Sequence, residues 1–366
     1  MEKEDIIWYS FSMDFSRPDN ARLINRLKTL LAIREKKNMT RAELSRELLI
    51  NKVSVSEIVD TLIKEGLVKE SGKLTIDSGR PATLLDIDVR AGKVIGLVIR
   101  EKGCLIAASD LKGKILRLER FPRGKTPDEL KENLKSSLER LLRNENVRIY
   151  GAVVVSDEDA EDIAASLPFE CICIRETEAQ VLAEQRRCSE ELGGMLFLHI
   201  SDEISAYYEG KELREFSHLR VGTDKACACG ATGCIGAYFS GNAFKEEMER
   251  IYDKVLSARE ILSCEEGRMM IEKNLKMLAI SISQAAEVLG AKSAMLIGEY
   301  SNLEDEAYAH LNEMTISLLP SWKNDFVVYK SIAGDGGAIE GACHKALDHF
   351  FYKKQLLESL KVLELY

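Results

Sequence analysis

The sequence predicts an α/β protein that begins with a small helical domain. Two observations indicate this fold class. From about residue 90 onward, apolar runs with strand character alternate with amphipathic helical segments, which is typical of α/β folds. Before that point, three helical segments precede two short strand-like runs. The chain has 366 residues, 45% of them hydrophobic, which is enough for two or three packed domains.

The N-terminal segment has the pattern of a helix-turn-helix. Residues 20–36 carry leucine and isoleucine at helical spacing, which predicts a first helix. Thr40 followed by Glu43 is the pattern of a capping box, so a second helix is expected over residues 41–48. After a short turn, apolar residues at helical spacing predict a third helix over residues 52–65.

Two predicted strands follow these helices. Residues 68–74 and 83–87 have strand character and are joined by the turn sequence Ser-Gly-Arg-Pro at residues 78–81. Such a hairpin is the wing of a winged helix-turn-helix. We therefore expect residues 1–88 to form a DNA-binding domain of this kind.

The polar side chains of this domain are placed as DNA binding requires. The third helix begins with short polar groups that could reach base edges and a lysine that could meet phosphate, and the wing carries an arginine suited to the minor groove. The predicted DNA-contacting residues are Asn51, Lys52, Ser54, Ser56 and Arg80. We expect a double-stranded DNA operator as the partner, and a winged helix that binds another protein is the alternative. Since helix-turn-helix dimers read two half-sites, we expect a homodimer or higher homo-oligomer on an inverted repeat.

Predicted strands and helices alternate in the rest of the chain. The strands are expected at residues 93–99, 104–109, 114–118, 150–155, 171–174, 195–199, 204–209 and 293–297, and the strand at 171–174 is expected to be buried. The helices are expected at residues 126–142, 176–184 and 274–289. Periodicity leaves the order of the strands open.

One histidine and three cysteines form a predicted zinc site. The ligands are His218, Cys227, Cys229 and Cys234. Zinc prefers four nitrogen or sulfur ligands in a closed tetrahedral site, and the glycines between these cysteines allow the backbone to fold tightly. A full ligand set leaves no position for a reactive water, so a structural Zn²⁺ is expected rather than a catalytic one. Ordinary buried thiols are the alternative.

Charge and cysteine content indicate the cellular setting. The net charge of -9 argues against attraction of the whole chain to nucleic acid, but basic and acidic groups are about balanced in residues 1–90. Nine cysteines in a chain without an export signal favour reduced thiols and a metal site over disulfides. Since no apolar run approaches the roughly 20 residues of a membrane span, we expect a cytoplasmic protein without membrane association.

Three parts of the chain resemble the ROK family, which contains transcriptional regulators and sugar kinases. The N-terminal segment with Gly79-Arg80-Pro81 looks like the winged helix of the family's regulators. Residues 215–218 and 227–234 are similar to its Glu-x-Gly-His and Cys-x-Cys-Gly-x-x-Gly-Cys motifs, with Ser217 in place of the usual glycine. Residues 334–342 resemble a glycine-alanine helix start in the family's C-terminal lobe.

The resemblance implies a two-lobed, actin-like ATPase fold of the ribonuclease-H type after the winged helix. The first lobe is expected over residues 89–190, to which the C-terminal helix could return. The second lobe, which carries the zinc motif, is expected over residues 191–366.

The resemblance also implies which residues a sugar kinase would need, and several are replaced. The family's catalytic aspartate aligns with Glu176, and the asparagine before it aligns with Arg175. The second phosphate-binding loop, at residues 200–205, has no glycine and carries two acids that would repel a triphosphate. We therefore expect no catalytic residues and no enzyme activity. An ATP-dependent sugar kinase with an accessory winged helix is the alternative.

The expected function is sequence-specific repression of carbohydrate-related genes by a non-catalytic ROK body joined to a winged helix. This body is expected to dimerise and to sense a sugar or another small ligand. Glu215 and His218 match the family's sugar-binding positions, whereas Gly236 stands where a second glutamate is usual. A sugar effector at Glu215 and His218, a different ligand, and no ligand all stay open.

Overall fold

The chain divides into two compact units. The computed structural model describes residues 18–36, 38–74, 81–143, 147–188 and 193–353. One unit comprises Met1–Ile174 together with Ala342–Tyr366, and the other comprises Arg175–Gly341. This division lies before helix α7 (Glu176–Arg187), whereas the sequence-based boundary was placed after it, at residue 190. The reason is that the α7 residue Glu184 accepts hydrogen bonds from backbone of the second unit.

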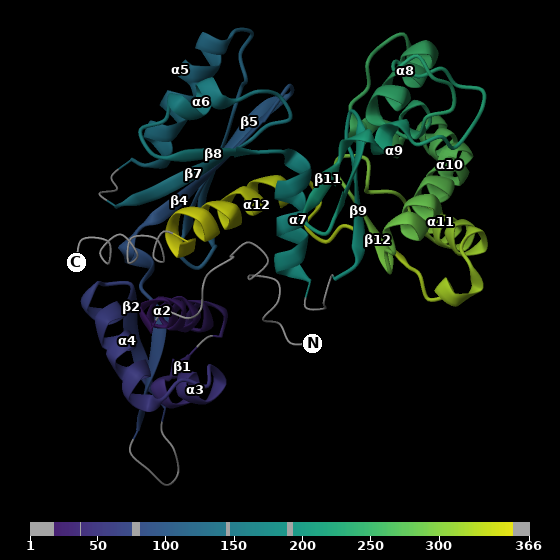
Figure 1. The fold of residues 1–366 in the computed structure, drawn as a ribbon. Coiled ribbons are helices and arrows are strands. Elements are labelled where there is room, and N and C mark those ends of the chain that lie inside the picture. Colours follow the sequence, from purple (N-terminus) through teal and green to yellow (C-terminus); the bar gives the residue numbers. More distant parts are fainter. Residues whose placement is uncertain (1–17, 37, 75–80, 144–146, 189–192, 354–366) are drawn as a thin grey trace. The chain divides into compact units, whose positions relative to one another are not determined.

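In the part of the N-terminal domain that the structure describes, three helices accompany a three-stranded antiparallel sheet of order β1-β3-β2 (Figure 1). Its elements are α2 (Pro18–Glu35), β1 (Met39–Thr40), α3 (Arg41–Glu47), α4 (Lys52–Lys64), β2 (Val68–Leu74) and β3 (Ala82–Ile87). The helices and the two longer strands occupy nearly the residues that the sequence predicts. Strand β1 was not predicted, because two residues carry no recognisable pattern.

Helix capping and the burial of apolar side chains explain why this domain adopts its fold. The hydroxyl of Thr40 accepts a hydrogen bond from the N–H of Glu43 at 3.2 Å, and the Glu43 carboxylate accepts one from the N–H of Thr40 at 2.8 Å. This capping box starts α3 and holds the pKa of Glu43 below its ordinary value. The apolar faces of the helices and the sheet meet in a core that fully buries Leu30, Leu44, Val55, Leu62 and Leu85.

The first unit also contains a five-stranded sheet of order β6-β5-β4-β7-β8. Its strands are β4 (Lys93–Arg100), β5 (Gly103–Asp110), β6 (Ile115–Phe121), β7 (Ile149–Val155) and β8 (Cys171–Ile174), and its helices are α5 (Pro127–Leu141) and α6 (Glu161–Ala165). Strands β4, β7 and β8 run parallel, whereas β4, β5 and β6 pair antiparallel. The expectation that β8 is buried was wrong for Cys173, which is exposed because β8 lies at the edge of the sheet.

The second unit is built on a five-stranded sheet of order β11-β10-β9-β12-β13. Its strands are β9 (Met195–Ile200), β10 (Ile204–Tyr208), β11 (Lys211–Leu213), β12 (Ser293–Ile297) and β13 (Val328–Lys330). Four helices lie on the side of the sheet opposite α7 (Figure 1), namely α8 (Gly241–Tyr252), α9 (Ala258–Ser263), α10 (Glu265–Leu289) and α11 (Asp305–Leu318). They enclose one apolar core with the sheet, in which Phe239, Phe244 and Tyr300 are fully buried.

The last described elements are α12 (Gly337–Ala346) and a π-helical segment (Leu347–Lys353). A glycine is required at Gly341, because a Cβ there would lie 1.7 Å from the backbone oxygen of Ala179. Short 3-10 segments lie at Val89–Ala91, Arg214–His218, Ile235–Ala237, Ser321–Lys323 and Gly334–Gly336. Among the described residues, no helix combines the length and apolar character that crossing a bilayer requires.

Candidate functional site

Four side chains that can bind a metal converge in the second unit. The Nδ1 atom of His218 lies 3.7 Å from Sγ of Cys227, and Sγ of Cys229 lies 3.7 Å from Sγ of Cys234. All four ligand atoms lie within 4.8 Å of one another, so the group could hold a metal ion. These are the four ligands that the sequence predicts, brought together from a 3-10 segment and the loop that follows it.

The donor set and its spacing fit zinc. A tetrahedral site with zinc–sulfur bonds of about 2.3 Å has ligand-to-ligand distances of about 3.8 Å. The two sulfur contacts of 3.7 Å have this length without any rearrangement. Three thiols and one imidazole are also a ligand type that structural zinc prefers. The cluster therefore has the chemistry and the dimensions of a closed zinc centre.

Backbone hydrogen bonds hold the cysteine loop in this shape. The N–H of Cys227 donates to the carbonyl of Ala231 at 2.8 Å, and the N–H of Gly233 donates to the carbonyl of Lys225 at 2.7 Å. Gly233 has φ of 87°, and a Cβ on it would lie 1.8 Å from the backbone oxygen of Gly222. Only glycine fits this position, because both the backbone conformation and the space exclude a side chain.

The thiols differ in their protonation. Burial raises the pKa of Cys234 to about 11. The pKa of exposed Cys229 is lowered, chiefly by a hydrogen bond from the backbone of Ala231. Cysteine binds metal as the thiolate. Metal binding at this cluster would therefore release protons, including the proton of Cys234.

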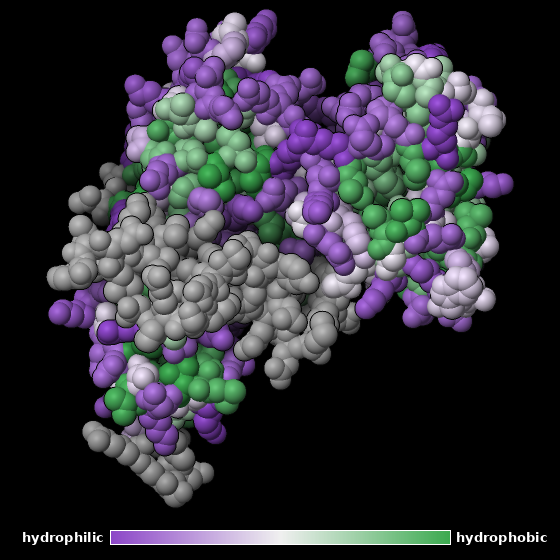
Figure 2. All heavy atoms as spheres, viewed as in Figure 1, coloured by the Kyte–Doolittle hydropathy of each residue, from purple (hydrophilic) through white to green (hydrophobic). Residues whose placement is uncertain are grey.

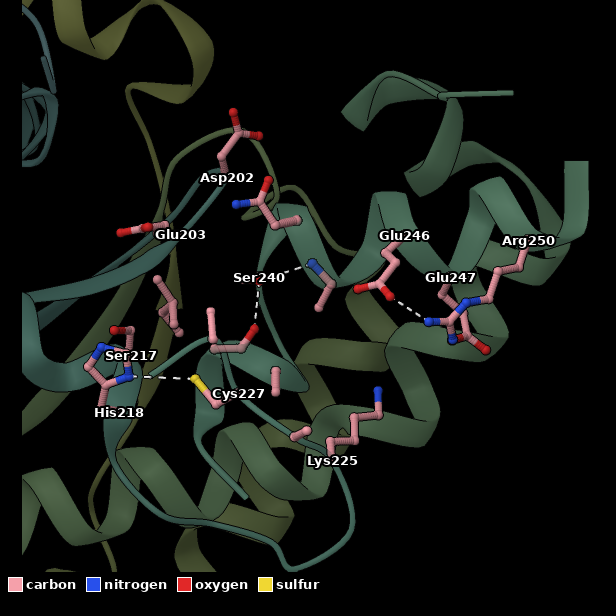
Figure 3. A pocket seen from close by; sticks show the side chains of 17 residues that line it. Asp202, Glu203, Ser217, His218, Lys225, Cys227, Ser240, Glu246, Glu247 and Arg250 are labelled. Carbon is pink, nitrogen blue, oxygen red and sulfur yellow. Dashed lines mark hydrogen bonds and ion pairs between the residues drawn. The ribbon is translucent and has the colours of Figure 1, made fainter. Parts of the chain in front are cut away.

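A groove of about 460 Å³ lies beside the metal-type cluster (Figure 3). His218 and Cys227 contribute to its lining from one side, and helix α8 and the loop between β9 and β10 contribute from the other. Its charged lining residues are Asp202, Glu203, Glu246 and Glu247 against Lys225 and Arg250. The excess of carboxylates makes the groove unfavourable for a polyanion such as a nucleoside triphosphate.

Most of these charges have partners within the same unit. Arg250 forms ion pairs with Glu246 and Glu247 on its own helix, and Lys245 pairs with Asp202. The pairs with Arg250 join exposed side chains, so they contribute little to stability and can rearrange around a ligand.

The two residues expected to bind a sugar are placed differently. His218 lines the groove together with Ser217 and Gly236. Glu215 is exposed on the same 3-10 segment and is not part of the groove lining.

The position aligned with the catalytic aspartate is occupied by a buried glutamate. Glu176 is the first residue of α7, is 7% exposed, and accepts a hydrogen bond from the side-chain amide of Gln180 at 3.0 Å. The preceding Arg175 forms an ion pair with Glu212 at 3.1 Å, and Arg214 contacts the same carboxylate. A carboxylate with its own amide partner is less available as a general base, since it would have to give up that hydrogen bond.

The start of α4 carries four of the predicted DNA-contacting residues. Asn51 is the N-cap of α4, and its side-chain oxygen accepts a hydrogen bond from the N–H of Ser54 at 2.8 Å. Lys52 is exposed, whereas Ser54 and Ser56 are half-buried. Arg80 lies outside the described residues. The cap engages one lone pair of the Asn51 oxygen, and the amide N–H groups of this exposed side chain stay free to donate.

Two exposed apolar residues at the same place were missed in the sequence analysis. Leu49 is 92% exposed and Val53 is 70% exposed. The run Leu48-Leu49-Ile50 could have indicated this exposure. The core of a helix-turn-helix buries only some residues of such an apolar run, so the others face solvent. Green hydrophobic residues reach the surface of the N-terminal domain beside purple hydrophilic ones (Figure 2).

Fold and site together define the class of this protein. The first unit combines the N-terminal helical domain with an α/β sheet, and the second unit carries the His/Cys3 loop on another α/β sheet. Residues 205–348 match the family model described as "ROK family". The chain is thus similar to the ROK family over a segment that includes the His/Cys3 loop.

Similar proteins include both kinases and regulators. An N-acetyl-D-glucosamine kinase from Shigella boydii serotype 4 is 26% identical over 166 residues, which is 41% of this chain and 53% of the kinase, so this chain spans about half the length of that relative. A xylose repressor from Caldicellulosiruptor bescii is 22% identical over 76% of this chain and 81% of the repressor.

A solved structure shares the fold over nearly the whole chain. The crystal structure of a ROK family transcriptional regulator, a homologue of the E. coli MLC protein, has a TM-score of 0.73 at 17% identity. The match covers 93% of this chain and 99% of that regulator. Since the 7% outside the match is shorter than residues 18–88, the shared fold extends into the N-terminal helical domain.

Proposed function

We propose that this protein is a DNA-binding transcriptional regulator that represses carbohydrate-related genes. The observation that carries the proposal is the N-terminal domain. Its helices α2–α4 and hairpin β2–β3 have the order of a winged helix-turn-helix, in which the last helix enters the major groove of DNA. The shared fold with a regulator and the similarity to a xylose repressor support the same function.

The proposed partner is double-stranded DNA with an inverted repeat. A homodimer would present two copies of α4 to half-sites about one helical turn or more apart. Selection of binding sequences from a random duplex library by the full chain tests this. Enrichment of an inverted repeat is the expected result, and no enrichment above the starting library would reject sequence-specific regulation.

Replacing Lys52 by alanine is expected to weaken DNA binding to all sequences alike. Lys52 is exposed at the start of α4, where a phosphate contact would position the helix without reading bases. Losing one such contact should reduce the slope of log affinity against log salt by about one. Titrations of the selected operator and of an unrelated duplex at several salt concentrations measure this slope.

Lys64→Ala is the matched control, because Lys64 is exposed on the same helix at its opposite end. It should leave affinity and salt slope unchanged. Equal losses in the Lys52 and Lys64 variants would contradict a specific phosphate contact at the start of α4.

We further propose that the His218 and cysteine cluster holds a structural zinc and that the adjacent groove receives a small effector. A volume of about 460 Å³ is that of a small-molecule site. His218 belongs to both the ligand set and the groove lining, so an effector there would rest against the zinc loop. Such a ligand changes DNA affinity only if it binds one conformation of the protein better than another.

The kinase relative favours an ATP-dependent sugar kinase as a second candidate function. Three features argue against kinase activity, namely the acidic groove, the two carboxylates between β9 and β10, and the buried Glu176. We therefore expect no ATP binding by calorimetry at millimolar nucleotide and no phosphorylation of a hexose panel. A ROK hexokinase in the same assay is the positive control. Micromolar ATP affinity with sugar turnover would establish the kinase instead.

A further inference from the structure

Two large apolar side chains are exposed to solvent in the turn between α3 and α4 and at the start of α4. Leu49 is 92% exposed in the turn, and Val53 is 70% exposed in the first turn of α4. Neighbouring apolar side chains of the same segment, Ile50 and Val55, are buried in the core. Burial in this domain therefore does not account for Leu49 and Val53, which lie on either side of the exposed Lys52 in the sequence.

The backbone of Leu49 adopts a conformation that is unfavourable for leucine. Leu48 is the C-cap of α3, and its N–H donates to the carbonyl of Leu44. The next residue, Leu49, has φ of 53°, the left-handed conformation in which helix ends favour glycine or asparagine. A leucine is strained in this conformation, and its exposed side chain makes no compensating packing in the fold.

The polar groups around this pair offer little base recognition. The Asn51 oxygen caps α4 through the N–H of Ser54, and Ser54 and Ser56 are half-buried. The exposed side chains at the start of α4 are Asn51, Lys52 and Val53, beside Leu49 in the turn. A lysine placed here meets phosphate, so sequence preference rests on the Asn51 amide N–H groups and on the apolar pair.

We infer that Leu49 and Val53 read thymine by packing against its 5-methyl group in the major groove. The thymine methyl is the apolar group that base pairs present in this groove, and cytosine, adenine and guanine lack it. The inference rests on the proposed function, because it requires α4 to lie in the major groove. DNA is favoured over a protein partner because Lys52 and the positive end of the α4 dipole lie beside the apolar pair and attract phosphate.

Deoxyuridine scanning tests the inference, since uracil differs from thymine only in lacking the methyl group. Each thymine of the selected operator is replaced in turn by deoxyuridine, and the affinity of the full chain is measured. The same duplexes are titrated with Leu49→Gly, Val53→Ser and Lys52→Ala. Thermal unfolding of each variant is recorded in parallel.

The unmodified chain should lose about fourfold in affinity for each methyl that it contacts. This loss should be confined to one or two thymines per half-site, and Leu49→Gly and Val53→Ser should each lose the preference for thymine over uracil at the position that the replaced side chain contacts. The Lys52 variant should bind both more weakly while keeping their ratio. Leu49→Gly should melt at the same or a higher temperature, because glycine relieves the left-handed strain, so weaker operator binding in this variant cannot come from unfolding.

The outcomes separate this inference from the proposed function. Site selection without enrichment rejects the regulator itself. Two results would reject methyl recognition alone. In the first, an operator is enriched but no uracil substitution changes its affinity. In the second, the Leu49 and Val53 variants keep the preference for thymine. Leu49 and Val53 would then face another partner, such as a protein.

Discussion

Replacing Cys229 by serine is expected to release the metal and to lower the melting temperature of the second unit. Cys229 lies 3.7 Å from Cys234 in the four-ligand cluster, and a serine hydroxyl is a poor substitute for a thiolate. Backbone hydrogen bonds hold the loop, and a bound metal would add four ligand bonds to them. Purified protein should contain one zinc per chain, and the variant should contain nearly none.

The size of this effect follows from mass action. A ligand at a free concentration a thousandfold above its Kd stabilises the folded state by about 4 kcal/mol. For a unit of 150 to 250 residues, this corresponds to a drop of about 8 to 16 °C in melting temperature. Metal analysis by mass spectrometry and thermal unfolding of the same preparations measure both quantities.

Cys264→Ser is the matched control for this prediction. Cys264 is another cysteine of the second unit, half-buried where Cys229 is exposed, and its sulfur caps α10 by accepting the N–H of Gly267. Serine is a good N-cap, so metal content and stability should be unchanged. A Cys229 variant that retains zinc, or an original protein purified without chelators that contains none, would contradict the zinc site.

Replacing Glu184 by alanine is expected to lower the melting temperature by about 5 to 10 °C. Glu184 is 1% exposed on α7. Its carboxylate accepts hydrogen bonds from the hydroxyl of Ser331, from the N–H of Ile332 at 3.1 Å and from the N–H of Ala333 at 3.0 Å. Alanine would leave these donors without their acceptor, which costs about 1 to 3 kcal/mol for each donor that water cannot reach.

Gln185→Ala is the control, because the adjacent Gln185 is exposed on the same helix. It should change the melting temperature by no more than about 1 °C. DNA binding by the folded Glu184 variant should be preserved at low temperature. Equal stability of the two variants would show that water replaces the carboxylate and that the loop before α12 does not depend on it.

Local signals in the sequence were sufficient for most of the elements. Strand β12 runs from Ser293 to Ile297 as predicted, and the capping box at Thr40 places the start of α3. These signals work because capping and the burial of one helix face act between residues a few positions apart. The zinc ligands could be predicted for the same reason, since three of the four lie within eight residues of one another.

Elements that depend on distant partners could not be predicted. Strands β1, β11 and β13 have only two or three residues and exist through pairing with a neighbouring strand. Helix α10 begins at Glu265, earlier than the predicted residue 274, because Cys264 caps it although cysteine is not a usual capping residue. The exposure of Cys173 likewise follows from the edge position of β8.

The sequence by itself predicted most of the helices and longer strands and the four residues of the metal-type cluster, because each depends on residue types at short spacing. Only the tertiary structure decided the strand orders, the separation of Glu215 from the groove beside His218, and the exposure of Leu49 and Val53. The physical reason is that exposure and contact depend on which distant segments pack together. Spacing along the chain specifies which side chains are available, and packing specifies which of them face solvent.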